Sequence, residues 1–323
     1  MKILVTGAPG FLGSHLTEKL VELGHDVRAL VHYDSNNNWG FLEKSKYKDK
    51  IEFVVGDIRD YDSVFSAMQG VDEVFHLAAL IGIPYSYLSP LAYIKTNIEG
   101  TYNVIQSARQ LNTKNIMITS TSETYGSAQY TPMDENHPKV GQSPYSATKI
   151  GADNLALSFH KSFGLPVKIV RPFNIYGPRQ SARAIIPAIA TQILNGVKSI
   201  KLGNLDAKRD LTFVKDTVMG FIEISKQEKF SGESVNIGMN EEVSIKELVE
   251  KISKIANKEV TIEVDKQRIR PDKSEVDRLM CNNEKLKNNS NWKPAYNLDK
   301  GLEETISWLE ENKKLFKHDI YNT

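Results

Sequence analysis

Tyr145 and Lys149 stand four positions apart in the segment Y-S-A-T-K, so on a helix they would share one face. A lysine ammonium beside a phenol stabilises the phenolate and lowers a pKa that is ordinarily about 10. The pair could therefore act as a general base near neutral pH. Because Tyr-x-x-x-Lys also occurs as an ordinary exposed helix pair, the assignment depends on the residues that accompany it.

Thr121, Ser122 and Glu123 follow a short apolar run at residues 116–118, which we interpret as a β-strand. Parallel sheets present their chemistry at the carboxyl ends of their strands. A tyrosine base, its lysine partner and the Glu123 carboxylate would then meet in one cleft. We predict that Thr121, Ser122, Glu123, Tyr145 and Lys149 form the catalytic set, and we expect no metal in the site.

A glycine-rich turn connects the first predicted strand, residues 3–6, to a helix that begins near Ser14. Gly7, Gly10 and Gly13 are spaced as G-x-x-G-x-x-G. Gly7 permits the tight turn, Gly10 lets the backbone approach a pyrophosphate, and Gly13 lets helix and sheet pack closely. The N-terminus of the helix supplies an anion site, so the stretch predicts dinucleotide binding.

The second strand, residues 27–31, ends without the acidic residue that usually bonds the adenosine ribose, and the first carboxylate is Asp34. No arginine cluster follows to receive a 2′-phosphate, which favours NAD and leaves NADP open. Asp57, after the third strand, could hold the adenine amino group or cap a helix. We interpret His76 as a packed strand residue. The predicted cofactor-binding residues are Gly7, Gly10, Phe11, Leu12, Gly13, Asp57, Ile58, Leu77, Ala78, Ala79, Thr119, Tyr145, Lys149 and Pro172.

Strands and helices alternate through the first half of the chain, which predicts an α/β protein with a Rossmann-type, doubly wound parallel sheet. We assign residues 1–172 to the dinucleotide-binding domain, with a return contribution around residues 215–238. Residues 173–323 would form mainly a smaller C-terminal α/β domain that binds substrate. Long helices are predicted at 91–111 and 143–163, and a polar surface turn at 285–291.

Composition excludes several classes of protein. The 323 residues carry 41 basic and 40 acidic side chains, a formal net charge of +1, which favours neither nucleic acid nor a membrane surface as a partner. A single cysteine, Cys281, excludes an internal disulfide and fits a reducing compartment. No segment is read as a signal peptide or a membrane span, so we expect a cytoplasmic protein.

Ordered motifs extend over nearly the whole chain: T-G-A-P-G-F-L-G, G-D-I-R-D, H-L-A-A, T-S-E-T-Y-G, Y-S-A-T-K, R-P-F-N-I-Y-G-P-R and R-D-L-T-F-V-K-D. Together they resemble the extended short-chain dehydrogenase/reductase family, in its nucleotide-sugar-modifying branch. The segments I-P-Y-S-Y-L-S-P, G-P-R-Q-S-A-R-A-I-I-P and R-P-D-K-S-E-V-D-R-L resemble the NAD-dependent 4,6-dehydratases of legionaminic acid biosynthesis. Those enzymes act on nucleotide-linked N-acetylglucosamine, with GDP as the carrier in part of the group.

The resemblance implies a mechanism. Tyr145, helped by Lys149, would take the proton of the sugar C4 hydroxyl while the C4 hydride passes to the nicotinamide, and Thr121 would bond the same oxygen. The new ketone acidifies the C5 proton, which Glu123 would remove. Water would leave from C6 and hydride return there, giving a 4-keto-6-deoxy sugar. Lys149 would also contact the nicotinamide ribose.

The resemblance also implies the partners of the protein. Asn174, Arg209 and Arg270 would bind the nucleotide diphosphate and its surroundings, and Arg179 and Arg183 are further candidates. The family is usually dimeric through its two long helices, so a homodimer through residues 91–111 and 143–163 is expected.

Ser122 keeps other reactions open. In dTDP-glucose-type 4,6-dehydratases the triplet is Thr-Asp-Glu, and its aspartate protonates the departing hydroxyl. Thr-Ser-Glu also occurs in UDP-glucuronate decarboxylases, which oxidise C4 and then lose the C5 carboxylate. A nucleotide-sugar epimerase would generally lack Glu123, and a non-catalytic NAD-sensing regulator would typically lack Tyr145 or Lys149. The sequence leaves open the nucleotide base, GDP or UDP, and the sugar 2-substituent.

Overall fold

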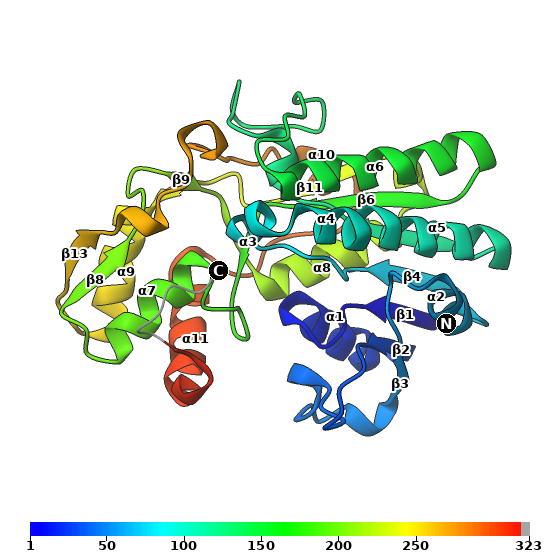
Figure 1. The fold of residues 1–323 in the computed structure, drawn as a ribbon, viewed down its shortest axis with the longest axis horizontal. Coiled ribbons are helices and arrows are strands. Elements are labelled where there is room, and N and C mark those ends of the chain that lie inside the picture. The colour runs from blue at the N-terminus through cyan, green and yellow to red at the C-terminus, as the bar shows by residue number, and fades with distance from the viewer. Residues whose placement is uncertain (318–323) are drawn as a thin grey trace.

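The computed structural model describes residues 1–317 and is built around one seven-stranded sheet (Figure 1). Its spatial order is β11-β6-β5-β4-β1-β2-β3, and every neighbouring pair is parallel. The chain builds outward from β1 to β3 and then returns past β1 to β4, which confirms the predicted doubly wound Rossmann fold. The strands are β1 (Lys2–Thr6), β2 (Asp26–Val31), β3 (Ile51–Val55), β4 (Glu73–His76), β5 (Asn115–Thr119), β6 (Val167–Pro172) and β11 (Ser234–Ile237).

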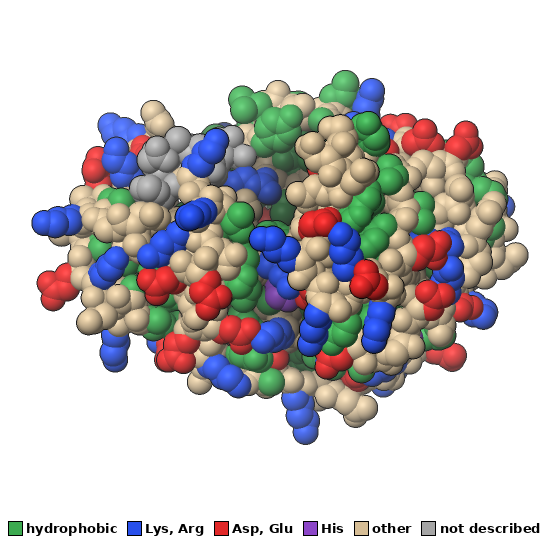
Figure 2. All heavy atoms as spheres, turned by 90° about the horizontal axis from the view of Figure 1, so that it is seen from below, with side chains coloured by type: hydrophobic (Ala, Val, Ile, Leu, Met, Phe, Trp, Pro, Cys, Tyr) green, Lys and Arg blue, Asp and Glu red, His purple; other side chains and the backbone are tan. Residues whose placement is uncertain are grey.

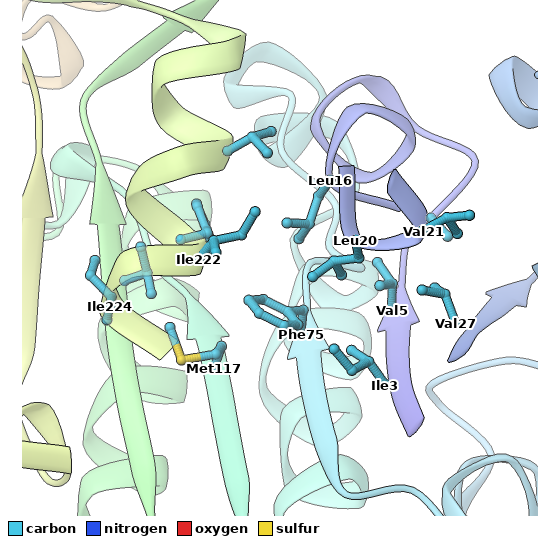
Figure 3. Packing of buried hydrophobic residues seen from close by; sticks show 14 of the residues in the cluster. Ile3, Val5, Leu16, Leu20, Val21, Val27, Phe75, Met117, Ile222 and Ile224 are labelled. Carbon is cyan, nitrogen blue, oxygen red and sulfur yellow. The ribbon is translucent and has the colours of Figure 1, made fainter. Parts of the chain in front are cut away.

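Helices cover both faces of the sheet because successive strand residues point to opposite faces. Ile3 and Val5 of β1 pack with α1 (Phe11–Glu22) and α8 (Val214–Ser225), in the core shown in Figure 3. Leu4, between them, packs in the core of the opposite face. That face is covered by α2 (Tyr61–Met68), α5 (Gly100–Leu111) and α6 (Pro144–Phe163).

A second lobe follows β6 and has its own hydrophobic core. It contains α7 (Ile185–Leu194), α9 (Ile245–Ala256), α11 (Leu298–Glu311) and the parallel pair β8 (Ser199–Leu202) and β13 (Thr261–Val264). Short ladders join β7 (Asn174–Tyr176) to β10 (Leu211–Phe213), and β9 (Lys208–Arg209) to β12 (Val243–Ser244). Between these segments the chain returns to the first lobe, where α8 covers the sheet and β11 forms its edge.

Two predicted elements differ from the structure. The helix predicted at 91–111 comprises α4 (Pro90–Tyr93), a π-helical segment (Ile94–Glu99) and α5. The prediction of a surface turn at 285–291 is wrong. Helix α10 (Glu284–Asn289) lies there, and its Leu286 is buried in the same core as residues of β11. One apolar residue in a polar stretch gives no periodic signal, so only the tertiary contact reveals this helix.

The remaining elements are short. A short helix, α3 (Ile83–Leu88), precedes α4. Among residues 1–317 we find no helix with the length and apolar character needed to cross a bilayer. The 3₁₀ turns are η1 (Gly40–Leu42), η2 (Lys48–Lys50), η4 (Ser122–Tyr125), η5 (Glu228–Phe230), η6 (Lys266–Arg268), η7 (Asp272–Ser274) and η8 (Lys313–Leu315).

Candidate active site

Local sequence fixes the start of α6, and with it the position of Tyr145. Ser143 caps the helix through a reciprocal capping box with Ser146, and Pro144 occupies the first helical position, where its missing N–H costs nothing. Tyr145 therefore lies in the first turn of α6 and Lys149 in the second. Both side chains are buried, with 7% and 4% of their surface exposed.

The lysine does not act on the tyrosine as the sequence predicts. Lys149 Nζ donates a hydrogen bond to the carbonyl of Thr119 at 2.5 Å, and burial lowers its pKa to about 8. Burial raises the pKa of Tyr145 well above its ordinary value, and the hydrogen bond with Thr121 opposes this only in part. Burial therefore raises the pKa of Tyr145 by more than the hydrogen bond lowers it, and the expected lowering by Lys149 is not among the influences on the phenol.

The end of β5 brings the predicted triplet to the same place. Thr121 caps η4 by accepting a hydrogen bond from the backbone N–H of Glu123. Glu123 lies 4.0 Å from the Arg270 guanidinium, an ion pair between the two lobes. Ser122 is buried. Tyr145, Thr121 and Glu123 therefore converge, as predicted, although they belong to two different elements.

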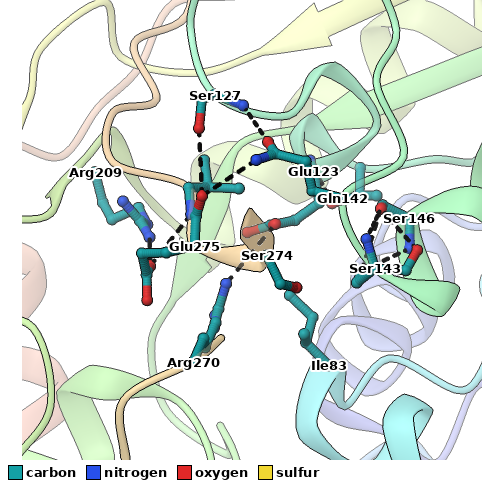
Figure 4. A network of polar contacts seen from close by, with 12 residues as sticks. Ile83, Glu123, Ser127, Gln142, Ser143, Ser146, Arg209, Arg270, Ser274 and Glu275 are labelled. Atoms are coloured by element: carbon teal, nitrogen blue, oxygen red, sulfur yellow. Dashed lines mark hydrogen bonds and ion pairs between the residues drawn. The ribbon is translucent and has the colours of Figure 1, made fainter. Parts of the chain in front are cut away.

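Arg209 joins this group from the second lobe (Figure 4). Its buried guanidinium lies 3.5 Å from the carboxylate of Glu275. Burial lowers the pKa of Arg209, whereas the nearby carboxylates of Glu123 and Glu275 raise it and Arg270 lowers it. Sequence reasoning did not select Glu275, because no motif marks it and it lies 66 positions from its partner. Arg209, Arg270, Glu123 and Glu275 thus form one cluster of charges, and Glu123 connects it to Tyr145.

The other predicted substrate-binding residues lie apart from this cluster. Arg179 pairs with Glu18 of α1 at 3.0 Å, which joins the loop after β7 to a helix of the first lobe. Arg183 is exposed, and its guanidinium lies so near Gly82 that a side chain there would meet it at 2.7 Å. Asn174 begins β7, and its buried side-chain oxygen lacks a hydrogen-bond partner among the described residues.

The glycine turn has the shape that a dinucleotide phosphate requires. Gly7 has φ +71°, and a Cβ there would come within 2.8 Å of the Ala78 nitrogen. A Cβ at Gly13 would meet the Gly7 carbonyl at 2.1 Å, so both positions exclude a side chain, whereas Gly10 has only one neighbour, at 3.3 Å. Helix α1 begins with no side-chain cap and no acidic residue in its first turn. Its N–H groups therefore fit a phosphate.

Hydrogen bonds decide between the alternative roles that the sequence offers for Asp57 and His76. Asp60 caps α2 through Ser63, whereas Asp57 binds the guanidinium of Arg59. Asp57 is therefore not the helix cap. His76 bonds Thr6 and Thr101, and burial lowers its pKa to about 3, which supports its interpretation as a packed, neutral residue.

The remaining predicted cofactor residues surround the carboxyl ends of the strands. Phe11 and Leu12 open α1, and Pro172 ends β6. Leu77 and Ala78 donate their backbone N–H groups to Thr6, and Ala79 follows them. Thr119 Oγ1 is buried without a hydrogen-bond partner among the described residues. Ile58 is buried against Gly100 of α5.

The active-site residues lie where the two lobes meet. Figure 2 shows a furrow between the lobes with lysine and arginine side chains along its walls. Leu80 and Ile83 pack with Tyr93 against Tyr145. The hydroxyls of Tyr87 and Ser274 lie 2.5 Å apart and join α3 to η7. Within residues 1–317 no group of three or more His, Cys, Asp or Glu side chains could hold a metal ion.

Comparisons with known proteins agree with this architecture. The family described as GDP-mannose 4,6 dehydratase matches residues 4–305. A UDP-N-acetyl-alpha-D-glucosaminuronate decarboxylase of Bacillus cytotoxicus is 32% identical over 96% of this chain and 98% of its own. A UDP-glucuronate 4-epimerase of Thermodesulfobacterium geofontis is 29% identical over 97% of this chain and 98% of its own. A dTDP-glucose 4,6-dehydratase of Streptomyces venezuelae, crystallised with NAD and TYD, superimposes with TM-score 0.89 at 28% identity, covering 98% and 99% of the chains. This chain therefore belongs to the GDP-mannose 4,6 dehydratase family of nucleotide-sugar-modifying enzymes.

Proposed function

We propose that the protein is an NAD-dependent nucleotide-sugar 4,6-dehydratase that converts GDP-N-acetylglucosamine, or its UDP form, to the 4-keto-6-deoxy sugar. The reaction would serve bacterial surface-sugar (legionaminic acid) biosynthesis. The observation that carries the proposal is the position of the Glu123 carboxylate beside Tyr145 and Thr121. Oxidation at C4 needs a base such as Tyr145, and removal of the C5 proton needs a second base such as Glu123 in the same site.

The residues can divide the work as follows. NAD, held by the glycine turn and Lys149, supplies the hydride acceptor and a cationic ring. Tyr145 receives the proton of the C4 hydroxyl, which Thr121 orients. Glu123 removes the C5 proton. The guanidiniums of Arg209 and Arg270 suit a diphosphate, since their planar forks match phosphate oxygens.

Decarboxylation is the second candidate function. Arg270 lies 4.0 Å from Glu123, so it could instead bind a C5 carboxylate, and the decarboxylase of Bacillus cytotoxicus is among the relatives. Ser122 supports the same alternative, because a serine is a poor acid at pH 7 and would not efficiently protonate the hydroxyl leaving C6. In a dehydratase, Glu123 or a water would return that proton.

One assay separates the reactions. We expect purified protein incubated with GDP-N-acetylglucosamine and UDP-N-acetylglucosamine to give a product lighter by one water in mass spectrometry. UDP-glucuronate serves as the third substrate. Loss of carbon dioxide from UDP-glucuronate without dehydration of either other sugar would overturn the dehydratase assignment in favour of the decarboxylase. An unchanged mass in all three would point to epimerisation or to no reaction.

We also propose a homodimer through the helices at 90–111 and 144–163. Apolar side chains remain exposed along this face, among them Leu91, Ile94 and Phe163. Pro90, Ile94, Ile98, Pro144, Ala147 and Thr148 line a shallow hollow of about 230 Å³ there.

A charge placed on this face tests the dimer. We expect Ile94→Glu to reduce the solution mass, measured by light scattering after size exclusion, from twice the monomer value to that of one chain. An unpaired carboxylate buried in an apolar interface costs more free energy than the burial of the Ile94 side chain contributes to association. Val264→Glu, on β13 of the other lobe, is the control and should leave the mass unchanged. A monomeric wild-type protein would contradict the proposal.

We further propose that residues 1–172 and 215–238 form the dinucleotide-binding unit and that residues 173–323 mainly bind the nucleotide sugar. We also propose a cytoplasmic location, which a chain with a single cysteine fits.

A further inference from the structure

Asp153 lies on α6 one helical turn beyond Lys149 and is completely buried. Its Oδ2 accepts hydrogen bonds from Ser120 Oγ at 2.7 Å and from the Arg171 guanidinium at 2.8 Å. Sequence analysis assigned no role to Asp153, Ser120 or Arg171. The three side chains nevertheless form a buried polar cluster next to the predicted catalytic residues of α6 and the end of β5.

Asp153 is the third residue of α6, after Tyr145 and Lys149, that contacts the end of β5. Tyr145, Lys149 and Asp153 occur every four residues on α6, so they follow one face of the helix. They bind three successive residues at the end of β5: Lys149 the carbonyl of Thr119, Asp153 the hydroxyl of Ser120, and Tyr145 the hydroxyl of Thr121. These contacts tie α6 to the strand end that continues into Ser122 and Glu123.

The pair of Asp153 with Arg171 is not explained by stability alone. Neither side chain is exposed to solvent. Desolvation of two charges commonly cancels their attraction, so apolar residues can replace such a pair without loss of stability. Arg171 also donates to the hydroxyl of Tyr125 at 2.8 Å, but Arg171 Nε and Asp153 Oδ1 both lack a hydrogen-bond partner among the described residues. A charged carboxylate has thus been kept beside the predicted site without a full set of hydrogen bonds.

We propose that Asp153 is a positioning residue of the reaction: its buried carboxylate keeps the Lys149 side chain charged and, through Ser120, holds the strand end that carries Thr121 and Glu123. The inference rests on the proposed roles of Tyr145 and Lys149. Asp153 touches neither substrate nor cofactor in this scheme. It acts through Lys149 and through the backbone of residues 119–121.

The electrostatics around Lys149 give the sign of the effect. Burial lowers the pKa of Lys149, and among residues 1–317 Asp153 is the group that opposes this shift; Asp153 also raises the pKa of Tyr145. Removing its charge should lower both pKa values, so the whole pH–activity profile should move toward acid. The other ionisable groups facing this region are His76 from β4, Tyr93 from α4, Glu123 from η4, Lys139 from the loop before α6, and Arg171 from β6.

The test uses a variant in which the pair is removed together. Asp153→Asn alone would leave the Arg171 charge buried and unpaired, which would destabilise the fold. Asp153→Asn/Arg171→Met removes both charges, and thermal unfolding verifies that it folds. In protein labelled with ¹³C-lysine, the Lys149 signal is assigned by its absence in Lys149→Arg, and its titration midpoint is followed by NMR.

We expect the midpoint of Lys149 in the double variant to lie below that of the wild type, because Asp153 raises the pKa of Lys149 whereas Arg171 is not among the groups that shift it. Asp153→Glu keeps the charge and should titrate like the wild type. An unchanged midpoint in the folded double variant would overturn the proposal. This readout needs no substrate, so it stands whether or not the proposed dehydration is observed.

The pH profile of turnover gives the second measurement, whichever nucleotide sugar is converted. Both limbs should move toward acid in the double variant and return in Asp153→Glu. A uniform fall in rate with unmoved limbs would indicate a merely structural role for Asp153 and would count against the proposal. If the wild type converts no nucleotide sugar, the proposed function fails, while the titration of Lys149 still decides the role of Asp153.

Discussion

Glu123→Gln is expected to stop dehydration while oxidation at C4 continues. The amide keeps the shape of the side chain but cannot accept the C5 proton, so the 4-keto sugar and the reduced cofactor should accumulate together. Loss of a general base typically costs a factor of about 10² to 10⁴ in rate. The measurements are the near-ultraviolet absorbance of reduced nicotinamide after substrate is added, and the mass of the released sugar nucleotide.

The control for this variant is Glu228→Gln, which removes one carboxylate from an exposed turn far along the chain. It should convert substrate at the wild-type rate. Cofactor binding should be intact in both variants, because Glu123 belongs to the strand end and not to the glycine turn. A Glu123→Gln protein with full dehydratase activity would show that another group removes the C5 proton.

Tyr145→Phe is expected to abolish the first step, with a loss of turnover of about 10² to 10⁴. The phenol is the group that Thr121 contacts, and its pKa is raised by burial in the free protein. A bound cationic nicotinamide favours the phenolate, so the rate should increase with pH as Tyr145 loses its proton. That increase should disappear from the residual activity of the variant.

Tyr93→Phe is the matched control for the tyrosine. The two rings lie 6.2 Å apart, but the Tyr93 hydroxyl donates to the carbonyl of Gly82. The Tyr93 variant should keep most of its turnover and the same dependence on pH. If both variants lose activity equally, packing around the pocket and not proton transfer explains the loss.

The differences between prediction and structure have particular causes. The strand and helix order follows from local apolar runs, and the capped start of α6 could be predicted from S-P-Y-S. Helix α10 could not, because its one buried residue, Leu286, is anchored by a strand about fifty positions earlier. The π-helical segment was missed as well, since its apolar pattern resembles that of the α-helix on either side of it.

The sequence by itself determined what depends on near neighbours: the spacing of Gly7, Gly10 and Gly13, the four-residue interval of Tyr145 and Lys149, and the alternation of strands and helices. Tertiary structure decided what depends on desolvation and on distant partners. Glu123 meets Arg270, and Asp153 meets Arg171, only because two lobes and two layers fold together. The high pKa of Tyr145 arises in the same way. The spacing of the motif predicts that Lys149 lowers this pKa, whereas burial of the phenol, which no motif encodes, raises it.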